Sequence, residues 1–312
     1  MSLKAHYILL SFFFFFSLQS CGEEDSNIYD YKEQKIVNDS TLNPWNNKGQ
    51  ETKSLKILAI GNSFTDDGTA YLPSLIQKAG IPNVTIAKMV VGGTSLQFHY
   101  THAVKNDTVY AFSVSTGDGF RSQGKKTFSE CLSSETWDYV IVQQLSNLSG
   151  MYHTYQPYLN DLIKIIYSYQ PNVGIGWQMT WAYSNNSTHS GFYNYEKSQT
   201  KMHEAIADAV NQMKTQTGVS LIIPTGMVIQ ELRGTHICND LELTRDGYHL
   251  DYGAGRYAAA CTWFETFIYP IYNVSVVNNT YRVNKGNIPV TDEVALLCQT
   301  IAASVVNNYY NK

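Results

Sequence analysis

The sequence carries little charge, and it has no surplus of basic residues. Of its 312 residues, 22 are Lys or Arg and 26 are Asp or Glu, which gives a formal net charge of −4. Proteins that bind nucleic acid typically show a marked excess of positive charge. The composition therefore gives no electrostatic signature for nucleic acid, and we expect none as a partner.

Paired cysteine motifs and metal-ligand clusters are also missing. No Cys-x-x-Cys pair occurs, so a zinc site built from cysteines is not expected. His99 and His102 lie three residues apart, but no nearby carboxylate or third histidine completes a metal site. A surface or supporting role is expected for both, although one could line an acyl pocket. We expect neither metal nor cofactor, and we expect buried free thiols, without a disulfide framework, at Cys131, Cys238, Cys261 and Cys298.

The N-terminus resembles a targeting segment. Residues 7–18 form an apolar run after Lys4 that is too short to span a membrane. Leu18-Gln19-Ser20-Cys21 resembles a bacterial lipobox, which implies cleavage before Cys21 and lipid on its sulfur; a plain secretory signal is the alternative. Residues 22–25 are acidic and resemble the surface-export signal of Bacteroidetes lipoproteins, or simply begin a solvated linker. We therefore expect an exported outer-membrane lipoprotein, which is exposed at the cell surface if residues 22–25 act as the export signal. The expected parts are a signal peptide at 1–20, a flexible tether at 21–52 and one domain at 53–312.

Apolar strand-like runs alternate with helical patterns through the rest of the chain. A continuous apolar run ending in Gly61-Asn62-Ser63 is typical of a buried parallel strand. The alternation predicts an α/β fold with a five-stranded parallel sheet covered on both faces. The expected strands are residues 55–61, 84–91, 137–142, 173–177 and 219–223. The expected helices are residues 70–79, 155–169, 202–213, 252–267 and 291–306.

Ser63 stands where a parallel sheet places its chemistry, beyond the carboxyl end of a strand. A serine hydroxyl needs a base within hydrogen-bond reach, and that base needs an orienting carboxylate. Asp246 and His249 are three residues apart and can supply both from one loop. Asp251 is the alternative acid.

Three motifs together resemble the SGNH (GDSL-type) serine hydrolases. Gly61-Asn62-Ser63 stands for the usual Gly-Asp-Ser, Gly92-Gly93 matches the second block, and Asp246 with His249 matches the last block. The resemblance, to a sparsely characterised Bacteroidetes subgroup with Gly-Asn-Ser-Phe, implies a flavodoxin-like three-layer α/β/α fold. It also implies a Ser63-His249-Asp246 triad, with an oxyanion held by the backbone N–H groups of Ser63 and of Gly92 or Gly93.

The third block of the family departs from its usual pattern. In place of Gly-x-Asn-Asp the chain has Gln143-Gln144-Leu145-Ser146-Asn147. An amide from Gln143, Gln144 or Asn147 could complete the oxyanion hole, and the sequence leaves the choice open. The two glutamines at the strand end are favoured, and the alternative is that these amides only tie loops together.

Aromatic residues after the fourth strand suggest a carbohydrate substrate. Trp177, Trp181 and Tyr183 lie at its carboxyl end, and residues 183–195 are rich in Asn, Ser and aromatics. Residues 106–124 look like another insertion near the mouth of the site. The sequence therefore predicts a carbohydrate esterase that removes an acyl, most simply an acetyl, group. The alternative is a catalytically weak or inactive glycan-binding lipoprotein on the same fold.

Three charged residues near these motifs receive ordinary interpretations. Asp66 and Asp67 follow the serine and are expected to be helix-start carboxylates. Arg245 is expected to be an exposed loop cation, with contact to an anionic substrate as the alternative.

Overall fold

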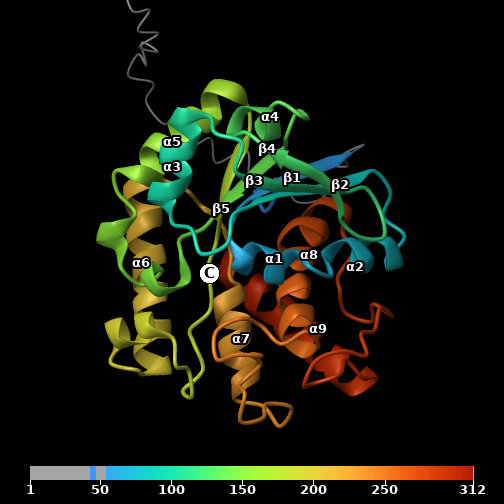
Figure 1. Cartoon of the computed structure of the whole chain (residues 1–312). Helices are drawn as coiled ribbons and strands as arrows, with labels where there is room; N and C mark the ends of the chain where they lie inside the picture. Colours follow the sequence, from blue (N-terminus) through green and yellow to red (C-terminus); the bar gives the residue numbers. More distant parts are fainter. Residues whose placement is uncertain (1–42, 47–53, 312) are drawn as a thin grey trace, which may run out of the picture. The chain divides into compact units, whose positions relative to one another are not determined.

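The computed structural model describes residues 43–46 and 54–311. Its centre is a set of parallel strands whose side chains are buried on both faces (Figure 1). These strands follow the order β2-β1-β5-β6-β7, which is the flavodoxin-like order of a doubly wound sheet. The predicted α/β class is confirmed. The strands are β1 (Leu55–Gly61), β2 (Val84–Val90), β5 (Tyr139–Val142), β6 (Gly174–Gln178) and β7 (Leu221–Ile223).

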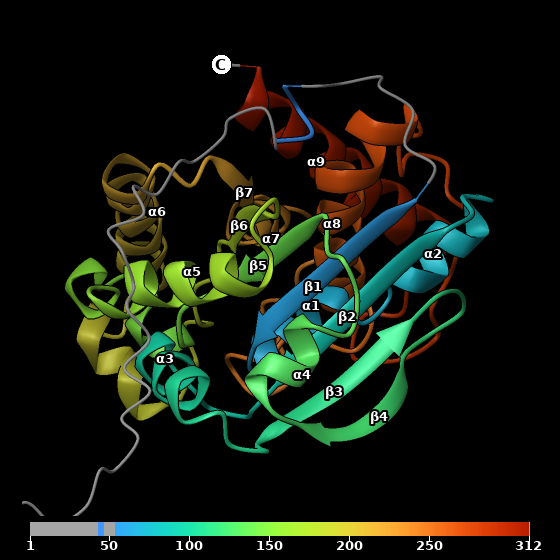
Figure 2. The same cartoon turned by 90° about the horizontal axis from the view of Figure 1, so that it is seen from above.

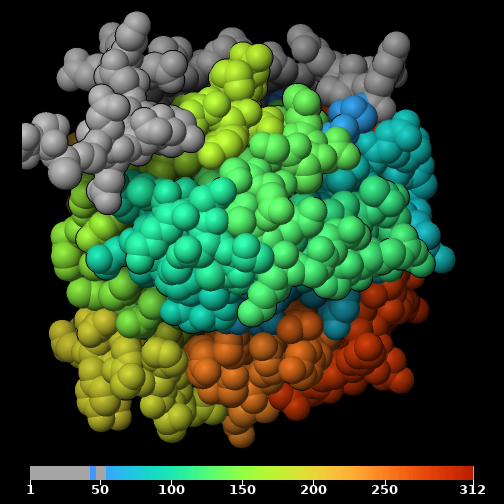
Figure 3. Space-filling view, turned by 45° about the horizontal axis from the view of Figure 1, so that its top comes forward, coloured from blue at the N-terminus to red at the C-terminus, as the bar shows by residue number. Residues whose placement is uncertain are grey.

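The sheet contains one antiparallel hairpin that the sequence did not predict, in addition to the five predicted parallel strands. β3 (Tyr110–Ser115) pairs antiparallel with β2, and β4 (Arg121–Lys126) pairs antiparallel with β3, so the sheet has seven strands. The hairpin falls in the stretch expected to be an insertion at the mouth. Its second strand, RSQGKK, is almost wholly exposed and lacks the apolar alternation that marks a strand. In Figure 3 this green segment lies at the surface.

Helices cover both faces of the sheet (Figure 2). One layer contains α3 (Leu96–Lys105), α4 (Phe128–Leu132) and α5 (Tyr158–Tyr169), and α6 (Gln199–Thr217) connects β6 to β7. The other layer is built around α8 (Ala254–Tyr272), which is buried along nearly its whole length. Four helices pack against it: α1 (Ser63–Thr69), α2 (Leu72–Lys78), α7 (Thr225–Arg233) and α9 (Asp292–Tyr310). Helices near all five predicted positions are present.

The sheet topology explains where chemistry can occur. After β1 the chain moves to β2 on one side, and it later returns to β5 on the other side of β1. Such a switch in strand order opens a crevice beyond the carboxyl ends of the strands. β1 ends at Gly61, where a Cβ atom would lie 2.2 Å from Thr65 Oγ1. Only glycine therefore fits this turn, and the turn delivers Ser63 into the crevice.

The four unpaired cysteines and the residues before β1 add two further observations. Cys131, Cys238, Cys261 and Cys298 are free, as predicted, and all but Cys238 are buried. Trp45 stacks on Tyr310 with ring centroids 4.7 Å apart, so this residue packs on α9.

Among the helices of the described ranges, none combines the length and apolarity that a membrane span requires. The predicted signal peptide, Cys21 and most of the tether lie outside the described residues.

Candidate active site

Ser63 is the first residue of α1 and is held in place by the residue before it. Asn62 caps the helix, because its Oδ1 accepts a hydrogen bond from Phe64 N at 2.9 Å. The other end of its amide donates to Thr94 O, also at 2.9 Å. Asn62 is 1% exposed, so its two hydrogen bonds hold the turn from inside the protein. Ser63 itself is partly exposed.

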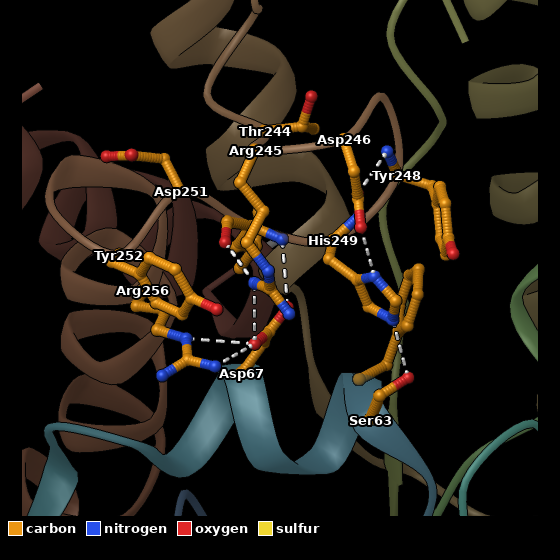
Figure 4. A network of polar contacts seen from close by, with 12 residues as sticks. Ser63, Asp67, Thr244, Arg245, Asp246, Tyr248, His249, Asp251, Tyr252 and Arg256 are labelled. Atoms are coloured by element: carbon orange, nitrogen blue, oxygen red, sulfur yellow. Dashed lines mark hydrogen bonds and ion pairs between the residues drawn. The ribbon is translucent and has the colours of Figure 1, made fainter. Parts of the chain in front are cut away.

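His249 connects Ser63 to Asp246 through two short contacts (Figure 4). His249 Nε2 lies 2.8 Å from Ser63 Oγ, and Nδ1 lies 2.7 Å from Asp246 Oδ2. Asp246 and His249 occupy a tight loop closed by a bridge between Thr244 and Leu250. The structure thus brings together three residues separated by up to 186 positions, in the order that nucleophilic catalysis requires.

The environment of Asp246 favours its charged form. Burial by itself would raise the pKa of this carboxyl group, but hydrogen bonds from the His249 side chain, from His249 N and from Tyr248 N outweigh burial and lower the pKa. An ionised Asp246 accepts a hydrogen bond from Nδ1–H, which keeps the proton of the neutral ring on Nδ1 and leaves Nε2 free to receive the proton of Ser63.

Asp67 anchors the loop that carries Asp246 and His249, a role that the sequence did not reveal. Its buried carboxylate binds Arg245 with both oxygens at 3.1 Å and Arg256 Nη2 at 2.6 Å. Asp67 Oδ2 also accepts Leu250 N at 2.9 Å. Figure 4 shows Asp67 on the same helix as Ser63, with both arginines directed at it. The expectation of a helix-start carboxylate was therefore wrong for Asp67, and Arg245 is not a free loop cation.

Asp251, the alternative acid, serves another part of the fold. Its carboxylate accepts the backbone N–H groups of Gly253 at 2.8 Å and Asn287 at 2.5 Å. It is 1% exposed and ties the start of α8 to the 286–288 loop. The residue that contacts His249 Nδ1 is Asp246.

The three candidate amides for the oxyanion hole have different surroundings. Gln143 is buried, donates to Asn62 Oδ1 and accepts from Thr65 Oγ1, both at 2.9 Å. Gln144 donates to Thr154 and accepts from Leu96 N at 3.0 Å. Asn147 is partly exposed, and within the described part of the chain its side-chain amide has no hydrogen-bond partner. The two glutamine amides are thus engaged in hydrogen bonds of the fold, whereas the Asn147 side chain packs against Gly191.

The two glycines after β2 are positioned at the surface. Gly92 and Gly93 lie in the turn after β2, separated from its last residue by Val91, and both are exposed. Gly93 has a φ of 67°, a conformation that other residues rarely adopt. A Cβ atom at either position would meet nothing within 4 Å, so the backbone at this turn is open to an approaching ligand.

The expected aromatic platform is not found at the predicted residues. Trp177, Trp181 and Tyr183 are 1%, 0% and 0% exposed, so they cannot present a surface to a substrate. Trp181 stacks on Phe64 at 4.2 Å and donates to Tyr248 O at 2.8 Å. It therefore supports the triad from within the core, between the Ser63 helix and the His249 loop.

His189 is a site residue that the sequence reasoning missed, although it lies in the 183–195 loop singled out there. Its ring packs against Tyr248 at 4.9 Å, and Tyr248 packs against His249 at 4.1 Å. Burial, with the nearby His249, lowers the pKa of His189. Its Nδ1 accepts from Gly191 N at 3.0 Å, so the neutral ring carries its proton on Nε2.

The two histidines considered as metal ligands do not form a metal site. His99 is buried between Thr94 Oγ1 at 3.2 Å and Tyr110 Oη at 3.3 Å. His102 pairs with Asp107 at 2.8 Å. Across the residues that the structure describes, no group of three or more His, Cys, Asp or Glu side chains is arranged to hold a metal ion.

The buried state of His99 predicts a loss of stability in acid. Burial lowers its pKa from 6.5 to about 3, and the charge of His102 acts in the same direction. Between these two values the unfolded chain binds a proton that the folded protein does not, so stability is complete above the upper value and falls as the pH drops.

We expect the free energy of unfolding to fall in this window by up to about 1.4 kcal/mol per pH unit beyond other contributions. Urea unfolding at a series of pH values should show that the free energy of unfolding depends more steeply on pH in the wild type than in His99→Gln. Identical slopes in the two proteins would contradict this account of His99.

Fold and site together define a class: a doubly wound α/β protein with a Ser-His-Asp arrangement beyond the carboxyl ends of its strands. The chain belongs to the family described as a domain of unknown function, DUF4886, whose family model matches residues 56–302. A DUF4886 family protein from Bacteroides uniformis is 35% identical, with a TM-score of 0.74. That match covers 82% of this chain and 95% of the Bacteroides protein.

More distant solved structures carry the names suggested by the sequence motifs. A proposed SGNH hydrolase from Slackia heliotrinireducens is 20% identical with a TM-score of 0.47, covering 69% of this chain and 99% of its own. Axe2, an acetylxylan esterase from Geobacillus stearothermophilus, is 15% identical with a TM-score of 0.44. That match covers 69% of this chain and 94% of the Axe2 chain. No curated protein matches the chain.

Proposed function

We propose that the protein is a serine esterase that removes an acyl group, most simply acetyl, from a carbohydrate. The proposal rests on one observation, the continuous contact from Ser63 Oγ through His249 to Asp246 at 2.8 Å and 2.7 Å. A serine at this position needs a base and an orienting acid to act as a nucleophile, and both are within hydrogen-bond reach.

In the first step Ser63 Oγ attacks the ester carbonyl carbon as its proton passes to His249 Nε2. Asp246 holds the imidazole in the required tautomer and stabilises the imidazolium ion. The tetrahedral intermediate then expels the alcohol, which takes the proton from His249. Water then gives a proton to His249 Nε2 and attacks the acyl-Ser63 ester, and His249 returns that proton to Ser63 Oγ as the bond to the acyl group breaks and the carboxylic acid leaves.

The negative oxygen of the intermediate requires hydrogen-bond donors that are already in place. We assign this role to the backbone N–H groups of Ser63 and of Gly92 or Gly93, with the Asn147 amide as the side-chain donor. The engagement of Gln143 and Gln144 in contacts of the fold supports the choice of Asn147. The glutamines instead hold the turn before Ser63 and the start of α3.

Turnover of p-nitrophenyl acetate by the purified domain tests the chemistry, and a panel of acetylated glycans tests the substrate class. The alternative, a glycan-binding protein without activity, predicts binding of glycans and no release of acetate. Release of acetate from at least one glycan, dependent on Ser63, supports the esterase; binding without release from any member of the panel overturns it in favour of the alternative.

We also propose that the protein is a lipoprotein anchored through Cys21, from the lipobox-like sequence before it. Replacing Cys21 with serine removes the sulfur that would carry the lipid. We expect the full-length protein to enter the detergent phase in a Triton X-114 partition and Cys21→Ser to remain in the aqueous phase. Equal partition of the two proteins would exclude a lipid at this residue.

A further inference from the structure

A second recess lies beside the Ser63 helix and plays no part in the triad. Its volume is about 540 Å³, and its walls come from α1, β2, the β3–β4 hairpin and the start of α8. Charged and aromatic side chains line it, among them Asp66, Lys88, Phe120, Tyr252, Arg256 and Lys285. Flat aromatic faces with a few polar groups are typical of a small-molecule site.

The recess is positively charged in a protein whose net charge is −4. Three of the six lining residues just named are cationic and one is anionic. Lys88 pairs with Asp66 at 2.6 Å, and Asp67 is shared between Arg256 and Arg245, so one arginine charge remains uncompensated there. Lys285 adds a positive charge and the buried Asp251, which holds its loop, adds a negative one, so the surroundings of the recess carry a surplus of one positive charge.

Two cations of the recess, Lys88 and Arg256, are held in place before any ligand arrives. Lys88 Nζ lies 4.2 Å from the centre of the Phe120 ring. The guanidinium groups of Arg245 and Arg256 each lie 4.6 Å from the centre of the Tyr252 ring. Such preorganisation reduces the entropic cost of binding an anion.

Lys285 belongs to a loop that the buried Asp251 fixes. Asp251 accepts the backbone N–H of Asn287 and that of Gly253, so it joins this loop to the start of α8. The cation is therefore carried by an anchored segment, and its side chain is exposed. Asp251, which does not contact His249, thus helps to shape the recess.

The recess adjoins the nucleophile along α1. Asp66 follows Ser63 by three residues, so the two side chains lie on neighbouring positions of one helical face, about 4.5 Å apart along the axis. Ala70, at the far end of the recess, is about 10 Å along the same axis from Ser63. In Figure 4 Tyr252 and Arg256 lie beyond Asp67, on the side away from Ser63.

We propose that this recess binds an anionic sugar residue on the alcohol side of the ester substrate. The proposal rests on the esterase function proposed above and names its substrate class: acylated acidic glycans. The ester carbonyl lies at Ser63, and a carboxylate or sulfate on the same or the next sugar lies among Lys88, Arg256 and Lys285. The rings of Phe120 and Tyr252 hold Lys88 and Arg256 in place to receive that anion.

The test compares matched esters that differ in one charge. An acetylated uronic acid oligosaccharide is assayed beside the same compound with its carboxylate methyl-esterified, and beside a sulfated acetyl ester. For the wild type, kcat/KM for the carboxylate or the sulfate should exceed that for the neutral methyl ester by about tenfold, because hydrogen bonds to charged groups are the stronger ones. A higher rate with sulfate assigns the site to sulfated sugars, and a higher rate with carboxylate assigns it to uronic acids. A ratio near one for both anions overturns the proposal.

The variant Lys285→Glu reverses one charge of the recess, with Lys125→Glu as its matched control. Lys125 is exposed on β4 and does not line the recess, so it changes the net charge equally. Lys285→Glu should lower the ratio of charged to neutral kcat/KM by about tenfold, and added salt should weaken the preference in the wild type. Equal ratios in the two variants would assign the preference to the net charge of the protein and would contradict the recess.

A binding measurement separates this proposal from the esterase proposal. The unacetylated acidic oligosaccharide is titrated into Ser63→Ala by calorimetry, with its methyl ester as the neutral reference. Tighter binding of the acid without hydrolysis of any ester by the wild type upholds the recess and overturns the esterase. Hydrolysis of simple esters by the wild type, with equal binding of the acid and its methyl ester to Ser63→Ala, upholds the esterase and overturns the recess.

Discussion

Replacing Ser63 with alanine will lower kcat for p-nitrophenyl acetate by about 10⁴- to 10⁶-fold, the effect expected when the nucleophile of the proposed triad is removed. The reason is that the proposed mechanism makes Ser63 Oγ, which lies 2.8 Å from His249 Nε2, the attacking atom. The free energy of unfolding should change little, since Ser63 is only partly buried and its neighbour Asn62 supplies the helix cap. Initial rates at saturating substrate measure the effect.

A double variant distinguishes a working triad from a chance arrangement. Because the three residues act as one unit, Ser63→Ala combined with His249→Ala should be no slower than Ser63→Ala alone. Ser122→Ala on the exposed strand β4 is the control for loss of a serine hydroxyl and should retain wild-type rates. If the loss of kcat in the double variant equals the product of the losses in Ser63→Ala and His249→Ala, the two residues act separately.

Replacing Asp67 with asparagine will lower the free energy of unfolding by about 3 to 5 kcal/mol. The carboxylate is completely buried and is the counterion of Arg245 and Arg256, so its loss leaves two arginines facing each other without a negative charge. The hydrogen bond to Leu250 N also weakens, which frees the loop that holds His249. Chemical denaturation measures the stability, and kcat measures the placement of the loop.

Asp66→Asn is the matched control for Asp67→Asn. The two residues are adjacent and lose the same charge, but Asp66 pairs with one cation, Lys88, and its side chain is 41% exposed, whereas that of Asp67 is completely buried. Pairs of this kind contribute about 0 to 1 kcal/mol. Adding Arg245→Met to Asp67→Asn removes one of the unpaired arginines and should restore part of the lost stability. Equal effects of the two asparagine variants would contradict the anchoring role of Asp67.

The sequence contained enough information for the parallel sheet and for the triad. Buried parallel strands are read from continuous apolar runs such as the one before Gly61, and five of these were found within a few residues. Ser63, Asp246 and His249 could be grouped because chemistry requires a base and an acid near the nucleophile. The Asp-x-x-His spacing is a weak signal by itself, so the grouping also rested on the resemblance of Gly61-Asn62-Ser63, Gly92-Gly93 and Asp246 with His249 to the SGNH motifs.

Other features depend on long-range packing that local pattern does not carry. Asp67 resembles any acidic residue in the first turns of a helix, and its arginine partners are 178 and 189 residues away. Trp177 and Trp181 follow a strand end, where aromatic residues either line a site or fill the core, and only the burial of these side chains decides between the two. The exposed strand β4 has no apolar period from which to predict it.

Labelling with a fluorophosphonate probe, followed by mass spectrometry of the modified peptide, tests the central claim most directly. The probe reacts with serines that a neighbouring base activates, and it requires no knowledge of the natural substrate. The account predicts one labelled residue, Ser63, with labelling abolished in Ser63→Ala and strongly reduced in His249→Ala. Absence of label at Ser63 in the folded wild-type protein, or equal label in His249→Ala, would contradict it.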